Sequence, residues 1–181
     1  VYCAGSVRGR TLDDFLPSNV SGVDSILQAQ RAEGSQSPLL LISSLAASRP
    51  ELSHYAHSKF LGEQVLRGVR DTPWSILRPP AVYGPGDTEM QPILKMVRRV
   101  LVFVPGGKPQ HLSLLYVDDL ASAVLAWLHA WQGCRNMTFS IDDGRQGGYD
   151  WPDIAQAAGC SSYRSIGIPF FVLAGAAQVN W

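Results

Sequence analysis

The stretch "PLLLISSLAASRPELSHYAHSKFLGEQVLRGVRDTPWSIL", Pro38 to Leu77, predicts a strand, a helix and a second strand in succession. Pro38–Ser43 is a continuous apolar run, and Trp74–Leu77 is a second, short apolar segment. Runs without polar alternation are typical of strands that are covered on both faces. Between them, apolar residues recur at three- and four-residue spacing from Leu61 to Val69, as in a packed helix. Strands joined by a helix pair in parallel, so this stretch indicates a parallel α/β sheet.

The alternation of helices and strands extends along the rest of the chain. Expected helices cover residues 12–33, 91–99, 118–131, 150–158 and 169–179, and expected strands cover 1–3, 113–117 and 137–141. Three prolines and two glycines predict irregular structure from Arg78 to Asp87. Asp118 or Asp119 is expected to cap its helix, and Cys3 is expected to be a small core residue. The order predicts an α/β fold, a Rossmann-like doubly wound parallel sheet with a small C-terminal region. Since "VYCAG" resembles the end of a buried strand, we expect this sheet to be N-terminally truncated.

The composition narrows the functional class. The chain of 181 residues is 46% hydrophobic and 17% charged, which is typical of a soluble folded protein. The formal net charge is zero, with 15 basic and 15 acidic side chains, so no nucleic-acid partner is expected. Three separated cysteines without a Cys-x-x-Cys pair favour a reducing, cytoplasmic location, and no zinc-ligand spacing occurs. No membrane span is expected, because the apolar C-terminal stretch is interrupted by Pro169 and is shorter than the required ~20 residues.

Tyr55 and Lys59 are four residues apart and lie on one face of the expected helix. A phenol has an ordinary pKa of about 10, and a neighbouring ammonium group lowers it. Tyr55 could then act as an acid or base near neutral pH. Ser44, or its neighbour Ser43, follows the preceding strand and is a candidate second donor. Together these groups can hold a carbonyl or hydroxyl group and move its proton.

Ser44, Tyr55 and Lys59 resemble the Ser…Tyr-x-x-x-Lys set of the short-chain dehydrogenase/reductases. Four segments resemble the extended branch of this family, which includes nucleotide-sugar epimerases and dehydratases and 3β-hydroxysteroid dehydrogenases: "VYCAGSV", "SNVSG", "LRPPAVYGPGD" and "YVDDLASAV". The resemblance implies that residues 1–87 form the C-terminal part of a dinucleotide-binding Rossmann domain. Residues 88–181 would form a mixed substrate-binding region, with a strand and helix at about 113–142 that return to the core sheet.

The resemblance also implies a role for each matched residue. Tyr55 would be the acid/base, Lys59 would lower its pKa and hold the nicotinamide ribose, and Ser44 would bind the reacting oxygen. The remaining implied contacts are with NAD or NADP, at Ala4, Gly5, Asn19, Pro79 and Val82, and with a small-molecule substrate, at Tyr83 and His111. No residue is expected to bind a metal.

The implied activity is that of an NAD(P)-dependent oxidoreductase, with hydride transfer at a secondary alcohol or ketone. "RSIGIPFFVLAGAAQV" resembles an apolar helix of hydroxysteroid and flavonol reductases and favours an apolar substrate. A nucleotide-sugar epimerase or dehydratase, and a non-catalytic cofactor-binding or assembly subunit, remain open alternatives. Relatives often dimerise through the tyrosine helix and the preceding helix, which favours a homodimer.

The Gly-x-Gly-x-x-Gly turn of the family does not occur in this sequence. The segment that distinguishes NAD from NADP is missing with it. Residues 1–181 alone are therefore expected to bind a dinucleotide poorly.

Overall fold

The computed structural model describes residues 1–91, 95, 101–105, 111–157, 159–160 and 164–168. The chain divides into two compact units. The first unit comprises Val1–Val82 and Leu115–Asp142, and the second comprises Tyr83–Leu114 and Asp143–Trp181. The two units are described separately below.

The first unit is built on a parallel sheet in the order β1-β2-β6. Its strands are β1 (Leu39–Ile42), β2 (Trp74–Arg78) and β6 (Met137–Ser140), and both neighbouring pairs are parallel. Tyr2 adds a parallel bridge to Leu41, so the start of the chain lies along β1 as expected. The predicted parallel pairing is confirmed.

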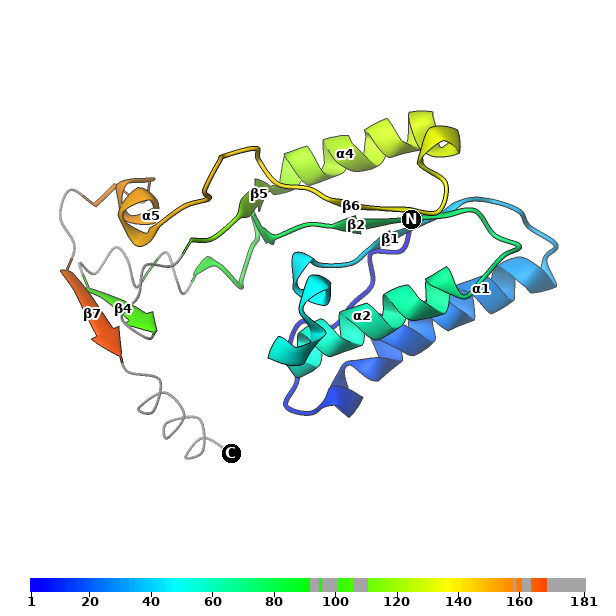
Figure 1. Ribbon diagram of the computed structural model, residues 1–181, viewed down its shortest axis with the longest axis horizontal. Helices are drawn as coiled ribbons and strands as arrows, with labels where there is room; N and C mark the ends of the chain where they lie inside the picture. The colour runs from blue at the N-terminus through cyan, green and yellow to red at the C-terminus, as the bar shows by residue number, and fades with distance from the viewer. Residues whose placement is uncertain (92–94, 96–100, 106–110, 158, 161–163, 169–181) are drawn as a thin grey trace. The chain divides into compact units, whose positions relative to one another are not determined.

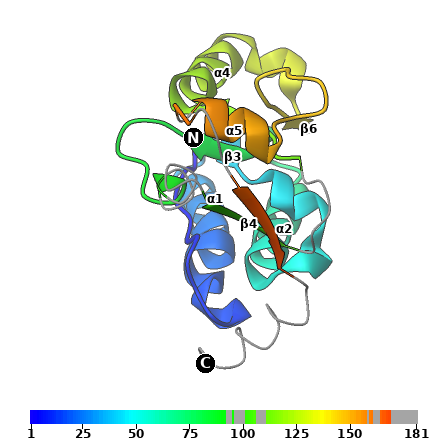
Figure 2. The same cartoon turned by 90° about the vertical axis from the view of Figure 1, so that its left-hand side faces the viewer.

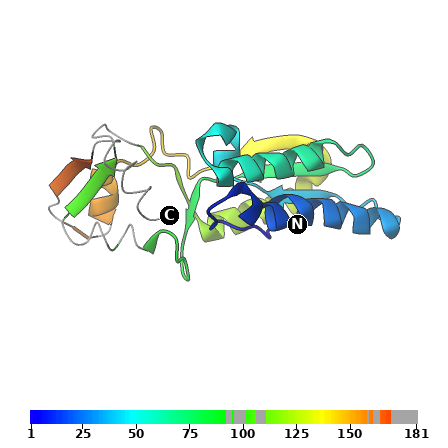
Figure 3. The same cartoon turned by 90° about the horizontal axis from the view of Figure 1, so that it is seen from below.

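Helices cover both faces of this sheet (Figure 1). On one face, α1 (Gly22–Ala32) and α2 (His54–Arg67) lie side by side (Figure 3). On the other face lies α4 (Val117–Ala130), as the view along the strands shows (Figure 2). A parallel sheet between two helical layers is the predicted Rossmann-like arrangement.

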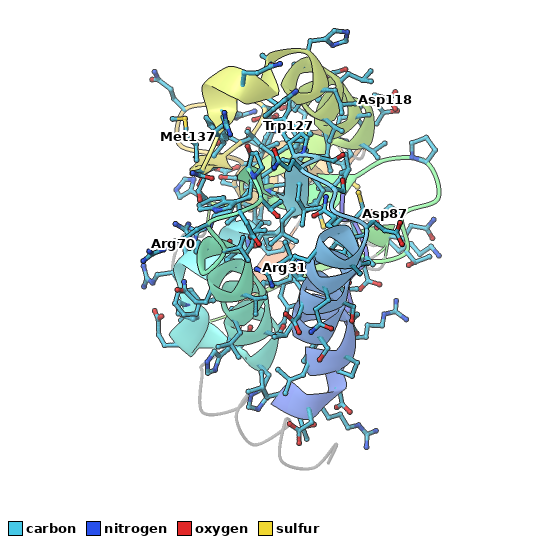
Figure 4. All side chains as sticks on the ribbon, turned by 90° about the vertical axis from the view of Figure 1, so that its right-hand side faces the viewer. Arg31, Arg70, Asp87, Asp118, Trp127 and Met137 are labelled. Atoms are coloured by element: carbon cyan, nitrogen blue, oxygen red, sulfur yellow. The ribbon has the colours of Figure 1, made fainter. Side chains whose placement is uncertain are left out.

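The two faces of β1 explain its continuous apolar run. Leu39 and Leu41 pack against α1 and α2, whereas Leu40 packs on the opposite face with Leu77 and Trp127. Trp127 lies on the side of α4 that faces the sheet (Figure 4). Because successive strand residues point to opposite faces, a strand between two helical layers needs an apolar residue at every position.

Helix starts follow local hydrogen bonding and differ in two places from the sequence prediction. The expected helix 12–33 is instead a 3-10 turn (Leu12–Asp14), a π-helical turn (Pro17–Ser21) and then α1. Pro17 lacks an N–H group and stands at the first position of its turn, where none is needed. The predicted cap by Asp118 or Asp119 is wrong, because the N-cap residue of α4 is Tyr116. Both carboxylates lie in the first turn of the helix, where the helix dipole favours negative charge.

Two further expectations are corrected. The segment Arg78–Asp87 is not wholly irregular, since it contains the short strand β3 (Ala81–Tyr83), which pairs with β5 (Leu114–Tyr116). Cys3 is exposed rather than in the core. Tyr2 packs against the core cluster, and its neighbour Cys3 therefore points the other way.

The remaining elements of the first unit are 3-10 turns. Two of them, η3 (Leu45–Ser48) and η4 (Pro50–Leu52), connect β1 to α2, and η5 (Trp131–Cys134) follows α4. Two short helical turns therefore make up most of the connection between β1 and α2.

The second unit contains a parallel strand pair and a short helix. The strands are β4 (Leu101–Pro105) and β7 (Arg164–Ile168), which the sequence pattern did not predict. The predicted helix 150–158 is confirmed as α5 (Trp151–Ala157). The expected helix 169–179, and most of the expected helix 91–99, lie outside the described residues.

Candidate active site

Ser44 and Tyr55 meet at the carboxyl end of β1. Ser44 follows this strand and caps η3, where its hydroxyl oxygen accepts a hydrogen bond from the Ala46 N–H at 3.2 Å. Tyr55 lies in the first turn of α2, which begins where the Ser53 hydroxyl accepts from the Ala56 N–H. The Ser44 side chain acts on the Tyr55 phenol as a hydrogen-bond partner that lowers its pKa. The structure thus brings two of the three predicted catalytic side chains near each other.

The environment of the Tyr55 phenol is apolar on one side. The ring of Phe15 meets the Tyr55 ring edge to face, with centroids 6.0 Å apart. Burial raises the pKa of Tyr55 above its ordinary value, and the hydrogen bond from Ser44 opposes part of this rise. The expected lowering of the Tyr55 pKa is wrong for this structure, because burial outweighs the hydrogen bond. The phenol is therefore protonated at neutral pH.

Lys59 lies one turn further along α2 and is only 8% exposed. Its ammonium group donates a hydrogen bond to the Ile42 carbonyl oxygen at 3.0 Å. Burial lowers the pKa of Lys59, and the charge of Glu63 opposes that change. The ammonium group is thus held against the strand end that leads to Ser44.

A polar network connects the loop after Tyr2 to helix α2. Asn19, which is 3% exposed, accepts a hydrogen bond from the Ser6 N–H at 3.0 Å and donates to the Ser6 carbonyl oxygen at 3.0 Å. Its amide also donates to the Ser58 hydroxyl at 2.9 Å, and Ser58 donates to the Tyr55 carbonyl oxygen at 2.7 Å. Asn19 therefore braces the candidate cofactor loop against the turn that carries Tyr55.

Gly5 lies close to two of these groups. A Cβ atom at Gly5 would come within 2.9 Å of Asn19 Oδ1 and 3.3 Å of Lys59 Nζ. Ala4, its neighbour, is exposed. The predicted cofactor residues Ala4, Gly5 and Asn19 thus belong to the same part of the first unit as Lys59.

The remaining predicted contacts are less closely tied to this site. The Pro79 carbonyl oxygen accepts a hydrogen bond from the Leu45 N–H at 2.8 Å, which places Pro79 beside the Ser44 turn. Val82 is half-buried in β3. Tyr83 and His111 belong to the second unit and are exposed. Their contacts with a substrate stay predictions.

The sequence prediction missed a buried ion pair beside the site. Glu63 is fully buried in α2 and binds the Arg78 guanidinium with both carboxylate oxygens, at 2.8 and 2.6 Å. The Ser43 hydroxyl donates to the same carboxylate at 2.6 Å. The only sequence signal is a glutamate one turn after Lys59, which on a helix is usually a surface residue.

Comparison with known proteins identifies the family. The model of the NAD dependent epimerase/dehydratase family matches residues 4–141, which include Ser44, Tyr55 and Lys59. The chain belongs to this family. The match confirms the predicted relationship to the extended short-chain dehydrogenase/reductases.

The sequence is also similar to that of a curated relative. A ceramide reductase of Caulobacter vibrioides is 35% identical over 161 residues, which cover 87% of this chain and 48% of the relative. The chain therefore spans about half the length of the curated relative that it matches.

Solved structures confirm the fold of this epimerase/dehydratase family member. UDP-glucuronic acid 4-epimerase from Bacillus cereus, in complex with NAD, matches with a TM-score of 0.72 and 17% identity, over 92% of this chain and 61% of that one. dTDP-4-dehydrorhamnose reductase from Bacillus anthracis, in complex with NADP, matches with a TM-score of 0.69 and 18% identity, over 94% and 65%. At these identities the likeness concerns the fold alone.

The described residues contain no group of three or more histidine, cysteine or acidic side chains placed to hold a metal ion. Nor do they include a helix of the length and apolarity needed to cross a membrane.

Proposed function

We propose that this protein is an NAD(P)-dependent ketone reductase in which Tyr55 donates a proton to the carbonyl oxygen. The observation that carries the proposal is the placement of Ser44 after β1 and of Tyr55 in the first turn of α2, one turn from the buried Lys59 ammonium group. Family membership supports it, because the family is defined by dependence on NAD.

The residues around Lys59 fit a nicotinamide nucleotide. An ammonium group has three N–H donors, and the hydrogen bond to Ile42 accounts for one of them. The other two suit the vicinal hydroxyls of a ribose. Gly5 keeps the approach to this ammonium group open, because any larger side chain would crowd Lys59 and Asn19. The bound cofactor would supply the hydride, and the same contacts suit NAD and NADP equally.

The protonation state of Tyr55 favours reduction. Since burial raises its pKa, the phenol carries its proton at neutral pH and can donate it to a carbonyl oxygen as the carbon accepts hydride. The Ser44 hydroxyl, whose oxygen is already bound by the Ala46 N–H, can turn its hydrogen towards the same carbonyl oxygen. Two donors on one oxygen would stabilise the developing negative charge.

We further propose a lipid-like ketone as substrate. The name of the Caulobacter relative supports a ceramide-type molecule. Two exposed leucines support an apolar substrate independently: Leu45 follows Ser44 directly and is 36% exposed, and Leu52 lies three residues before Tyr55 and is 68% exposed. Both lie on the turns that join the two candidate catalytic groups.

An assay of the protein expressed from its complete gene tests this function. A ceramide whose secondary hydroxyl has been oxidised to a ketone is incubated with NADH or NADPH, and cofactor oxidation is followed by absorbance. We expect stoichiometric cofactor oxidation with this ketone and none with UDP-glucose or UDP-glucuronic acid. Inversion of a nucleotide sugar without net cofactor consumption would instead support the epimerase alternative, which the description of the family model also includes.

The homodimer and the cytoplasmic location remain predictions. Light scattering of the purified protein tests the first, and cell fractionation tests the second.

A further inference from the structure

Glu63 is the most completely buried charged side chain among the described residues, with an exposed fraction of 0%. Its carboxylate accepts hydrogen bonds from three donor atoms, which belong to two residues. Oε1 accepts from the Ser43 hydroxyl at 2.6 Å and from Arg78 Nε at 2.8 Å, and Oε2 accepts from Arg78 Nη2 at 2.6 Å. Arg67 adds a longer ion pair, with Nη2 at 3.6 Å from Oε2.

Both residues that hydrogen-bond to Glu63 are adjacent in the chain to a residue of the candidate site. Ser43 precedes Ser44, and Arg78 precedes Pro79. Glu63 itself is one helical turn after Lys59 and two turns after Tyr55. One carboxylate therefore connects the helix that carries the phenol and ammonium groups to the ends of both strands that border the site.

The geometry of these bonds restricts relative movement. A bidentate arginine–carboxylate pair is directional as well as strong, and a third donor on the same carboxylate fixes its rotation. Sliding or rotation of α2 against β1 would have to break the short Ser43 bond or the paired Arg78 bonds. The Ser44–Tyr55 contact depends on the same relative position of α2 and β1.

We propose that Glu63 is a positioning residue, which sets the distance between the Ser44 hydroxyl and the Tyr55 phenol by binding Ser43 and Arg78 from helix α2. The inference rests on the proposed function, in which these two groups act on the same oxygen. A buried ion pair by itself often contributes little net stability, so its placement beside the site suggests a role in geometry.

Ser43→Ala is the most selective test, because it removes one hydroxyl and leaves the Glu63–Arg78 pair intact. Ser75→Ala is the matched control. Ser75 is also a buried serine and lies within the neighbouring strand β2. It is 1% exposed, against 5% for Ser43. Its hydroxyl donates to the Cys134 carbonyl oxygen at 2.7 Å and accepts from Trp127 Nε1 at 2.8 Å, on the α4 side of the sheet.

Two readouts separate positioning from stability. The first is kcat for the oxidised ceramide, measured well below the melting temperature, together with the Kd for NADH. The second is amide hydrogen exchange at Ala46, whose N–H is bound by the Ser44 hydroxyl, and it requires no turnover. We expect Ser43→Ala to lower kcat by about tenfold or more, with an unchanged Kd, and to speed exchange at Ala46. Ser75→Ala should lower the melting temperature about as much as Ser43→Ala does. It should change neither kcat nor the exchange rate at Ala46.

Equal kcat and equal Ala46 exchange in the two serine variants would overturn the inference. If the wild-type protein has no turnover with any ketone, the proposed function fails, and the exchange rates alone decide the inference. Glu63→Gln, which keeps the shape and removes the charge, is expected to reproduce both effects of Ser43→Ala more strongly. A folded Glu63→Gln variant with wild-type kcat and wild-type exchange would also overturn it.

Discussion

The Lys59 ammonium group donates a hydrogen bond to the Ile42 carbonyl oxygen at 3.0 Å. Ile42 ends β1, and Ser44 follows two residues later, so this bond ties the helix of Tyr55 to the strand that leads to Ser44. The lysine is only 8% exposed, yet its ammonium group lies beside Gly5 in the candidate cofactor loop. Lys59 thus has both a structural bond and donors that suit a ribose.

Replacing Lys59 by Met should weaken cofactor binding, since it retains most of the side-chain length and removes the charge and all three donors. A hydrogen bond to a charged group contributes about 1.5–3 kcal/mol, so we expect affinity for NADH and NADPH to fall about tenfold or more. Fluorescence titration measures the Kd. Arg31→Met, which removes an exposed cation paired with Asp71 at 2.9 Å, is the control and should leave the Kd unchanged. Wild-type cofactor affinity in Lys59→Met would contradict the assigned role.

Tyr55→Phe should abolish proton donation and spare cofactor binding. Loss of the phenol hydroxyl leaves no donor in its place, so kcat should fall by about 100-fold or more while the Kd for NADH stays within a factor of about two. Tyr2→Phe is the control, because its hydroxyl donates to the Ser18 carbonyl oxygen at 2.7 Å and belongs to no catalytic contact. Biological activity that survives Tyr55→Phe unchanged would favour the non-catalytic alternative.

Much of this site could be predicted from the sequence, because its parts follow local patterns. The apolar run of β1 and the helical spacing of α2 place Ser44 and Tyr55 at the same edge of a parallel sheet. The pattern could not show that burial would raise the Tyr55 pKa, since desolvation depends on groups from elsewhere in the chain, such as Phe15. The Glu63–Arg78 pair was missed for the same reason: a charged residue on a helix is buried only when a distant partner binds it.

The strands of the second unit and β3 were also missed. β3 spans only Ala81–Tyr83 among prolines and glycines, where composition predicts a loop. Pairing with β5, which is distant in sequence, supplies its hydrogen bonds. β4 and β7 pair with each other, and the apolar run Leu101–Val104 is a local strand signal that the sequence prediction overlooked.

Gly62→Ala should destabilise the first unit. A Cβ atom at this position would lie 2.1 Å from the Asn19 carbonyl oxygen, so α2 would have to move away from the π-helical turn. We expect a loss of about 1–3 kcal/mol or more in the free energy of unfolding, measured by denaturant titration. Gly68→Ala, where the nearest atom is the Val65 carbonyl oxygen at 3.4 Å, is the control in the same segment and should change stability little. An equal loss in both variants would show that the close approach at Gly62 does not occur.

The pH dependence of ketone reduction follows from the direction of the Tyr55 pKa. A raised pKa keeps the phenol protonated as pH rises, so kcat should be nearly constant from about pH 6 to pH 9 and fall only at higher pH. Lys59 has a lowered pKa and loses its charge before an ordinary lysine does, so the Kd for NADH should rise on the alkaline side first. Steady-state kinetics and titrations across this range measure both. A kcat that halves near pH 7 would mean that another group donates the proton.

The most direct test of the account follows a deuterium atom from cofactor to product. The protein is incubated with the oxidised ceramide and with NADH or NADPH that carries deuterium at the transferable position of the nicotinamide ring, and the lipid product is analysed by mass spectrometry. We expect one deuterium at the carbinol carbon of the product from the wild-type protein and far slower formation of labelled product by Tyr55→Phe. A reduced product without deuterium, or labelled product formed equally fast by Tyr55→Phe, would contradict hydride transfer assisted by Tyr55.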